Sequence, residues 1–133
     1  KKDIIDIAKR ASSELDEYMC IHVRRGDRIT NKQIDIDTQP NNIIKMINEY
    51  KPKNVYIMTN KLNELKQLSN IENIYFYTNF NFLDKINDNY YLFCIENNIM
   101  KFAKIRCSTF NAKSIDKISN YYHCYLHDSP GSQ

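Results

Sequence analysis

The stretch Tyr18-Met19-Cys20-Ile21-His22-Val23-Arg24-Arg25-Gly26-Asp27 decides the fold of this chain. Its first six residues are mostly aromatic, β-branched or otherwise apolar, which favours a buried β-strand over residues 18–23. Two arginines, a glycine and an aspartate follow without a break. The sequence therefore predicts a core strand with a group of charged residues at its carboxyl end.

Outward from this strand, the apolar residues alternate between the period of a helix and the period of a strand. Further strands are predicted over residues 54–59, 73–78 and 104–109. The complete order is α-β-α-β-α-β-α-β-α. This alternation is typical of a Rossmann-like, three-layer α/β/α fold with a mainly parallel sheet.

The predicted helices are recognised by their apolar faces and their starts. Residues 27–39 are expected to form a polar loop, and Pro40 suits the first position of the helix that follows. Asn60 and Asp88 are expected to cap two later helices. The apolar faces of the helices include Ile4, Ile5, Ala8, Leu15, Ile43, Ile47, Leu62, Leu65, Leu68, Leu92, Ile95, Ile99, Ala103, Ile115, Ile118, Tyr122 and Leu126.

Length and composition indicate one domain. A chain of 133 residues that is 42% hydrophobic and 26% charged suits a single α/β domain over residues 1–128, with 129–133 as a tail. No apolar run approaches the roughly 20 residues of a membrane span, so we expect a soluble chain without membrane contact. The net charge of +3 is too small to indicate nucleic-acid binding and suits a small anion better.

The cysteines and glycines narrow the possible chemistry. The cysteines Cys20, Cys94, Cys107 and Cys124 are scattered without a CxxC pair, so we expect buried free thiols and no zinc cluster or dense disulfide framework. With only Gly26 and Gly131, the chain has neither a GxGxxG nor a Walker loop. A phosphate site would therefore need side-chain donors.

Arg24 and Arg25 can supply those donors, because a guanidinium matches phosphate oxygens with a planar fork of N–H groups. Alternation along a strand sends the two arginines to opposite sides. One should face a crevice together with His22, and the other should serve the structure, for example by pairing with Asp27. In parallel sheets, ligands bind beyond the carboxyl ends of the strands. Polar residues collect at those predicted ends: His22, Arg24, Thr59, Asn60, Thr78, Asn79, Ser108 and Thr109.

The run from His22 to Asp27 resembles the HxRRGD motif of α1,2-fucosyltransferases and the HxRR motif of α1,6- and protein O-fucosyltransferases. Cys107-Ser108-Thr109-Phe110 resembles their second signature, a strand that ends in a Ser/Cys-Thr-Phe run. The resemblance spans Tyr18 to about Ile118. It implies the C-terminal, donor-binding Rossmann-like half of a GT-B glycosyltransferase that binds GDP-fucose without a metal or other cofactor.

The resemblance also implies roles for individual residues. Arg24 would hold the β-phosphate, His22 would approach the nucleoside, and Ser108 and Thr109 would offer hydroxyls to the diphosphate. Glu96 falls where the α1,6 enzymes have an aspartate that recognises guanine, and a carboxylate accepts both N1–H and N2–H2 of that base. The candidate substrate-binding residues are His22, Arg24, Arg25, Asp27, Asn60, Glu96, Ser108, Thr109 and Phe110.

The candidate catalytic residues are Arg24 and Asp35. Asp35 lies nearest to the place of the glutamate that serves as base in the α1,6 enzymes. The sequence departs from the family pattern at two places. Asn60-Lys61 stand where family members commonly carry one or two aspartates, and Arg28 stands where the α1,2 enzymes prefer an aromatic residue. Asp35-Ile36-Asp37 also matches the metal-binding DxD pattern of other glycosyltransferases, which stays an alternative.

Three other functions are alternatives for this sequence. A non-catalytic nucleotide- or glycan-binding module would have the same fold and the same arginines. A response-regulator-like domain would need an aspartate at the end of a central strand, and no predicted strand ends in one. Arg25-Gly26-Asp27 spells the integrin-binding tripeptide, but it adjoins a buried strand. If the chain is the donor half, a glycan or protein acceptor needs an additional N-terminal domain, and residues 1–133 alone should bind donor without transferring sugar.

Overall fold

The computed structural model describes residues 2–30, 32–108 and 121–123, without the side chains of 27, 28, 33, 34 and 121–123. Its strands are β1 (Tyr18–Val23), β2 (Asn54–Thr59), β3 (Ile74–Tyr75), β4 (Ile105–Ser108) and β5 (Tyr121–His123). They form one sheet in the order β3-β2-β1-β4-β5, and every neighbouring pair is parallel. The chain is thus a mixed α/β protein with an all-parallel sheet, consistent with a Rossmann-like fold.

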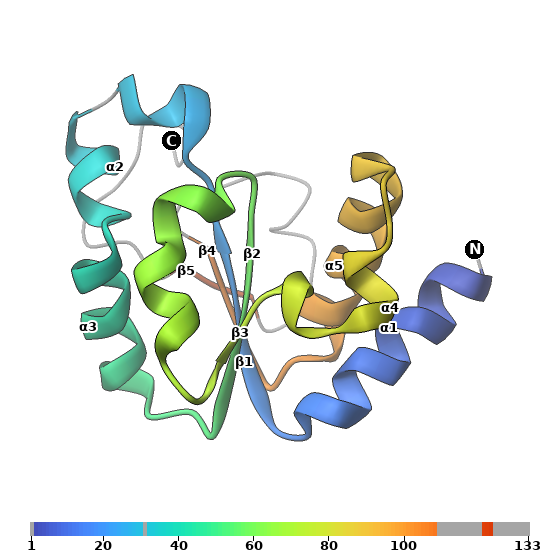
Figure 1. Ribbon diagram of the computed structural model, residues 1–133. Coiled ribbons are helices and arrows are strands. Elements are labelled where there is room, and N and C mark those ends of the chain that lie inside the picture. The colour runs from blue at the N-terminus through green and yellow to red at the C-terminus, as the bar shows by residue number, and fades with distance from the viewer. Residues whose placement is uncertain (1, 31, 109–120, 124–133) are drawn as a thin grey trace.

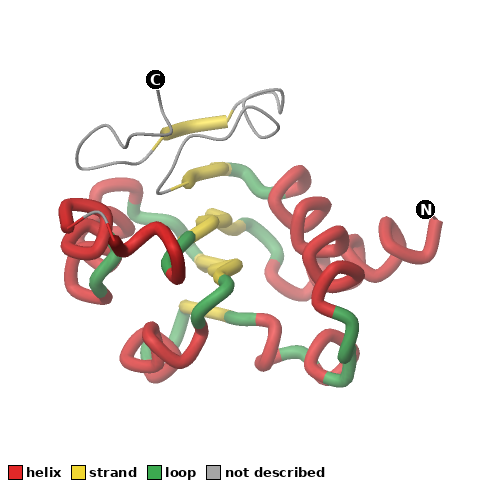
Figure 2. Tube along the Cα trace, turned by 90° about the horizontal axis from the view of Figure 1, so that it is seen from above, coloured by secondary structure: helices red, strands yellow, loops and turns green. Residues whose placement is uncertain are grey.

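The helices lie on both sides of these strands (Figures 1 and 2). They are α1 (Lys2–Leu15), α2 (Lys32–Asp37), α3 (Pro40–Tyr50), α4 (Asn81–Asp84) and α5 (Asn89–Phe102), with the 3-10 helices η1 (Gly26–Thr30), η2 (Leu62–Asn70) and η3 (Tyr77–Asn79). Figure 1 shows α1, α4 and α5 on one side of the sheet and α2 and α3 on the other.

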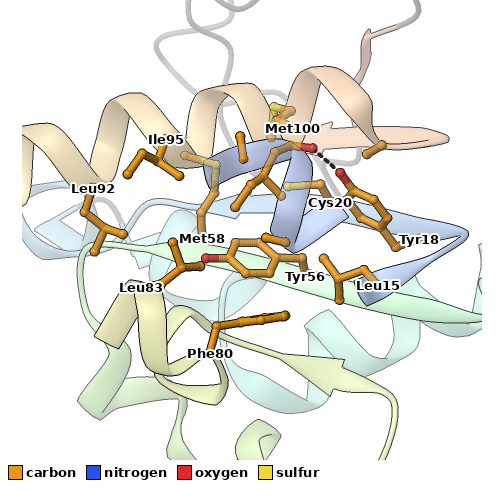
Figure 3. Close-up of a cluster of buried hydrophobic side chains, with 14 residues drawn as sticks. Leu15, Tyr18, Cys20, Tyr56, Met58, Phe80, Leu83, Leu92, Ile95 and Met100 are labelled. Carbon is orange, nitrogen blue, oxygen red and sulfur yellow. Dashed lines mark hydrogen bonds between the residues drawn. The ribbon is translucent and has the colours of Figure 1, made fainter. Parts of the chain in front are cut away.

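Alternation along β1 divides the core into two clusters. Tyr18 and Cys20 pack with α1 and α5, and Figure 3 shows that cluster. Met19, Ile21 and Val23 pack on the opposite face against α3 and η2. All six residues of β1 are buried, as expected for the central strand of a sheet that is covered on both faces.

The cluster on the α5 face contains a buried polar anchor. The hydroxyl of Tyr18 donates a hydrogen bond of 2.6 Å to the carbonyl oxygen of Ile99 in α5. It also lies 3.1 Å from the hydroxyl of Ser12 in α1. Because a buried hydroxyl without a partner is costly, this contact ties both helices to the start of β1.

Two helix starts are as predicted. Pro40 occupies the first turn of α3. The side chain of Asp88 caps α5 by accepting hydrogen bonds from the backbone N–H groups of Tyr90 and Tyr91. Both helices place their apolar stripes in the core, which is what their spacing indicates.

Three predicted segments differ in the structure. The expected loop over 27–39 contains η1 and α2. The strand expected over 73–78 is only two residues long, because the chain turns into η3 directly after Phe76. Asn60 does not cap η2: Lys61 stands at that position without a side-chain cap, and the side chain of Asn60 instead accepts from the backbone N–H of Arg25.

The expected last helix is wrong at Tyr121–His123, which form β5 alongside β4. The prediction rested on apolar spacing, but pairing here satisfies backbone groups that an edge strand would leave open. The rest of that predicted helix, and the tail at 129–133, lie outside the described residues. The expectation of buried free thiols holds for Cys20, while Cys94 is a half-buried free thiol and Cys107 is disulfide-bonded.

Candidate functional site

The order of the strands places a topological switch point at the carboxyl ends of β1 and β4. From β1 the chain passes to β2 and β3 on one side and returns to β4 on the other, so the connections diverge between β1 and β4. Ligands of open α/β sheets bind at such a switch point, beyond the carboxyl ends of the strands. His22 and Ser108 are register partners at this end of the sheet.

His22 is a buried residue near the carboxyl end of β1. Its side chain is 7% exposed, and its ring centroid lies 6.1 Å from that of Phe93 in α5. Burial, and secondarily the positive charge of Arg24, lowers the pKa of His22 from 6.5 to about 4. The imidazole is therefore neutral at pH 7 and offers one hydrogen-bond donor and one acceptor.

Arg24 supplies positive charge beside this neutral ring. It directly follows the last residue of β1 and is partly exposed. Its charge is close enough to His22 to contribute to the lowered pKa of the imidazole. A partly exposed guanidinium at the carboxyl end of a central strand can bind an anion that approaches this end of the sheet.

Arg25 lies in a different environment, as the alternation of side chains predicts. It is buried, and its Nε and Nη2 atoms form ion pairs of 2.6 Å with Glu64 of η2 and Asp35 of α2. Its Nη1 donates to the hydroxyl of Thr38 and to the carbonyl oxygen of Asp35. The guanidinium thus joins the end of β1 to both neighbouring helices, which is a structural role.

The partners of Arg25 differ from the one that the sequence suggested. Asp27 was the expected partner, whereas the acidic partners in the structure are Asp35 and Glu64. The side chain of Asp27 lies outside the described residues. Asp35, the candidate general base, accepts hydrogen bonds at Oδ1 from both Arg25 and Gln39. Its carboxylate therefore anchors Arg25, and its role as a base stays a prediction.

Gly26 and Asn60 form a tight contact at the same turn. Gly26 has φ of +66°, a conformation that L side chains rarely adopt. A Cβ atom at this position would lie 2.9 Å from Nδ2 of Asn60, while Oδ1 of Asn60 accepts from the backbone N–H of Arg25 at 3.1 Å. Asn60, a candidate substrate-binding residue, thus supports the turn that carries the two arginines.

Glu96 is buried between α5 and the sheet. Its side chain is 6% exposed, and its Oε2 accepts a 2.6 Å hydrogen bond from the hydroxyl of Tyr56 in β2. Burial raises the pKa of Glu96 from 4.5 to about 8, although the bond from Tyr56 acts in the opposite direction. The spacing correctly indicates that Glu96 lies on the buried face. Its role in reading guanine stays a prediction.

The second signature is only partly described. Ser108 is fully buried at the end of β4, on the strand that pairs with β1. Thr109 and Phe110 lie outside the described residues. The structure therefore brings His22, Arg24 and Ser108 to one end of the sheet, while Arg25, Asn60 and Asp35 support the turn beside them.

Some contributors were not singled out from the sequence. Phe93 contacts His22, Tyr56 bonds to Glu96, and Glu64 and Thr38 hold Arg25. Phe93 precedes Glu96 by three residues on the same helix, and that spacing could have placed both side chains on neighbouring positions of one helix face. Glu64 and Thr38 give no comparable signal, because their contacts with Arg25 depend on the tertiary fold.

The described residues contain neither a metal cluster nor a membrane span. Within residues 2–30, 32–108 and 121–123, no group of three or more His, Cys, Asp or Glu side chains is placed to hold a metal ion. No helix in the same ranges is long and apolar enough to cross a membrane. Comparison with models of protein families, with curated proteins and with solved structures finds no match to this chain.

The network around Arg25 predicts a loss of stability on mutation. Arg25→Ala should lower the free energy of unfolding by about 1.5–3 kcal/mol, since hydrogen bonds to charged groups are worth that much and Asp35 and Glu64 lose their shared partner. Arg25→Lys should recover only part of it, because an ammonium lacks the planar fork. Urea unfolding measures both variants. Lys53→Ala, which breaks an exposed ion pair with Asp16, is the control and should change little.

The raised pKa of Glu96 predicts a specific pH dependence of stability. Between pH 4.5 and about 8 the folded state keeps a proton on Glu96 that the unfolded state releases, so stability falls as pH rises. Glu96→Gln cannot ionise. Its stability relative to the wild type should grow by about 1.4 kcal/mol per pH unit across that window and stay constant below it.

The control for this experiment is Glu49→Gln, on the exposed surface of α3. That substitution removes the same charge from a site in contact with water, so its stability difference should stay nearly flat with pH. Urea unfolding at several pH values from 4 to 8 gives both profiles. If Glu96→Gln followed the profile of Glu49→Gln, Glu96 would be ionised in the folded state and this interpretation would be wrong.

Proposed function

We propose that this chain is the donor-binding domain of a fucosyltransferase-like glycosyltransferase and that it holds the diphosphate of GDP-fucose at the carboxyl end of β1. The observation that carries the proposal is the different surroundings of two adjacent arginines. Arg25 forms ion pairs with Asp35 and Glu64 that support the fold, whereas Arg24 lies beside His22 at the switch point of the sheet.

The charge at this site suits a diphosphate. Arg24 contributes a permanent positive charge, and the imidazole of His22 beside it is neutral at pH 7. When the bond from the anomeric carbon to the β-phosphate breaks, negative charge grows on the leaving GDP. A pre-placed Arg24 would stabilise that charge more in the transition state than in the ground state, so the binding contact would also assist catalysis.

The wider architecture of the proposal is a three-layer α/β/α domain that forms one half of a GT-B enzyme. Inverting transfer also requires an acceptor hydroxyl, held by another domain, and a base. Asp35 is the candidate base, although it is already bonded to Arg25. Because positioning of two reactants supplies roughly 7–11 kcal/mol of barrier reduction, we expect this domain alone to bind donor without efficient transfer.

A second candidate function is a binding module of the same fold that has lost catalysis. The observation in its favour is Asn60, which stands where the related enzymes carry an aspartate and whose side chain contacts the turn at Arg25 and Gly26. Both candidate functions predict donor binding. They differ in hydrolysis or transfer of fucose once an acceptor domain is supplied, which only the enzyme would perform.

A comparison of the nucleotides that the chain binds tests the proposal directly. A thermal-shift screen and isothermal titration against GDP, GDP-fucose, UDP, CMP and ADP should show the largest stabilisation with the guanine diphosphates, because binding to the folded state raises its stability in proportion to RT ln(1 + [L]/Kd). A chelator should leave the affinity unchanged. A strict requirement for Mg²⁺ or Mn²⁺ would instead favour the alternative in which Asp35 and Asp37 bind a metal.

Arg24 should contribute more to this affinity than Arg25 does. Arg24→Ala removes a charge-assisted pair to phosphate worth about 1.5–3 kcal/mol, so the Kd for GDP should rise by roughly tenfold or more. Lys53→Ala removes the same charge at the opposite end of β2 and should leave the Kd unchanged. Isothermal titration measures the Kd for GDP in Arg24→Ala, Arg25→Ala and Lys53→Ala. If Arg24→Ala and Arg25→Ala lost equal affinity, the assignment of Arg24 to the ligand and Arg25 to the structure would be wrong.

A further inference from the structure

The first half of α5 carries two exposed aromatic side chains. Tyr90 is 75% exposed and Phe93 is 42% exposed. Residues three apart lie on neighbouring positions of one helix face, so the two side chains form a single apolar surface near the capped start of the helix. Large aromatic side chains are usually buried, and this pair therefore needs an explanation.

The position of Phe93 connects this surface to the carboxyl end of β1. Its ring centroid lies 6.1 Å from that of His22, with the ring planes at 56°. His22 in turn is affected by the charge of Arg24. A cation, a neutral imidazole and a partly exposed aromatic ring thus follow one another from the end of β1 to α5. These three groups, in this spatial order, are complementary to a ligand that is anionic at one end and flat and apolar at the other.

We propose that Phe93, extended by Tyr90, is the stacking platform for the base of a nucleoside diphosphate whose phosphates are bound by Arg24. This inference rests on the proposed function and adds a subsite to it. Stacking on an aromatic side chain suits every base, because every base has a π-face. The platform therefore supplies affinity for the nucleoside end, and groups at the edge of the base supply the choice among bases.

The same helix offers a matched comparison. Phe102 in the last turn of α5 is 40% exposed, almost the same fraction as Phe93. It follows Phe93 by nine residues, toward the start of β4 and away from the carboxyl ends of the strands. Isolated surface aromatics of this kind are common. If Phe93 contacts the ligand, replacing it should weaken binding more than replacing Phe102 does. If removal of any surface ring had a general effect, the two replacements should behave alike.

The test measures Phe93→Ala, Phe93→Tyr and Phe102→Ala by isothermal titration with three probes. The probes are GDP, ribose 5-phosphate and inorganic pyrophosphate. We expect Phe93→Ala to raise the Kd for GDP roughly five- to hundredfold, the range that loss of one stacked base gives, and to leave the Kd for pyrophosphate unchanged. Phe93→Tyr should retain most of the GDP affinity because the flat ring remains. Phe102→Ala should behave as the wild type, and melting curves check that all variants fold.

Four outcomes would overturn this inference. An unchanged Kd for GDP in Phe93→Ala would show that the ring does not touch the base, while the proposed function would stand because GDP still binds. An equal loss with ribose 5-phosphate would show that the ring contacts sugar and not base. If the wild type bound pyrophosphate but gained nothing from the nucleoside of GDP, the base subsite would be absent. Failure of the wild type to bind any of the three probes would refute the proposed function together with the subsite.

Discussion

The rest of the candidate site depends on the buried guanidinium of Arg25. Its ion pairs with Asp35 and Glu64, and its bond to Thr38, join the end of β1 to α2 and η2. A buried charge is stable only when its donors are satisfied, so this network constrains the conformation of the turn that follows β1. The backbone N–H of the same residue is held by Asn60, against which Gly26 packs with a positive φ.

This constraint has a consequence for the neighbouring residue. If side chains continue to alternate beyond the strand, Arg24 lies on the side opposite Arg25, the side of α5 where Phe93 contacts His22. The effect of the Arg24 charge on the pKa of His22 agrees with that placement. The low pKa of His22 keeps its imidazole neutral beside the positively charged Arg24 at neutral pH. A structural arginine and a candidate ligand-binding arginine thus depend on each other through one backbone turn.

Much of this arrangement could be predicted from the sequence, and the reasons for the misses are physical. The strand Tyr18–Val23, the cap at Asp88, the buried position of Glu96 and the opposite sides of the two arginines all follow from local periodicity and capping chemistry. The partners of Arg25 did not, since Glu64 lies 39 residues away and meets it only through the tertiary fold. The strand at Tyr121–His123 was missed because pairing with the edge of β4 overrides the helical spacing of apolar residues.

The central claim is that an anionic nucleotide binds at the carboxyl end of β1, between Arg24 and α5. Titration of the ¹⁵N-labelled protein with GDP, followed by backbone amide chemical shifts, tests it most directly. We expect saturable changes that are largest at His22, Arg24 and Phe93, and little change at Asp16, Lys53 and Lys104, which lie at the opposite ends of the strands. Changes concentrated at Asp16, Lys53 and Lys104, or no saturable change at any residue, would contradict the claim.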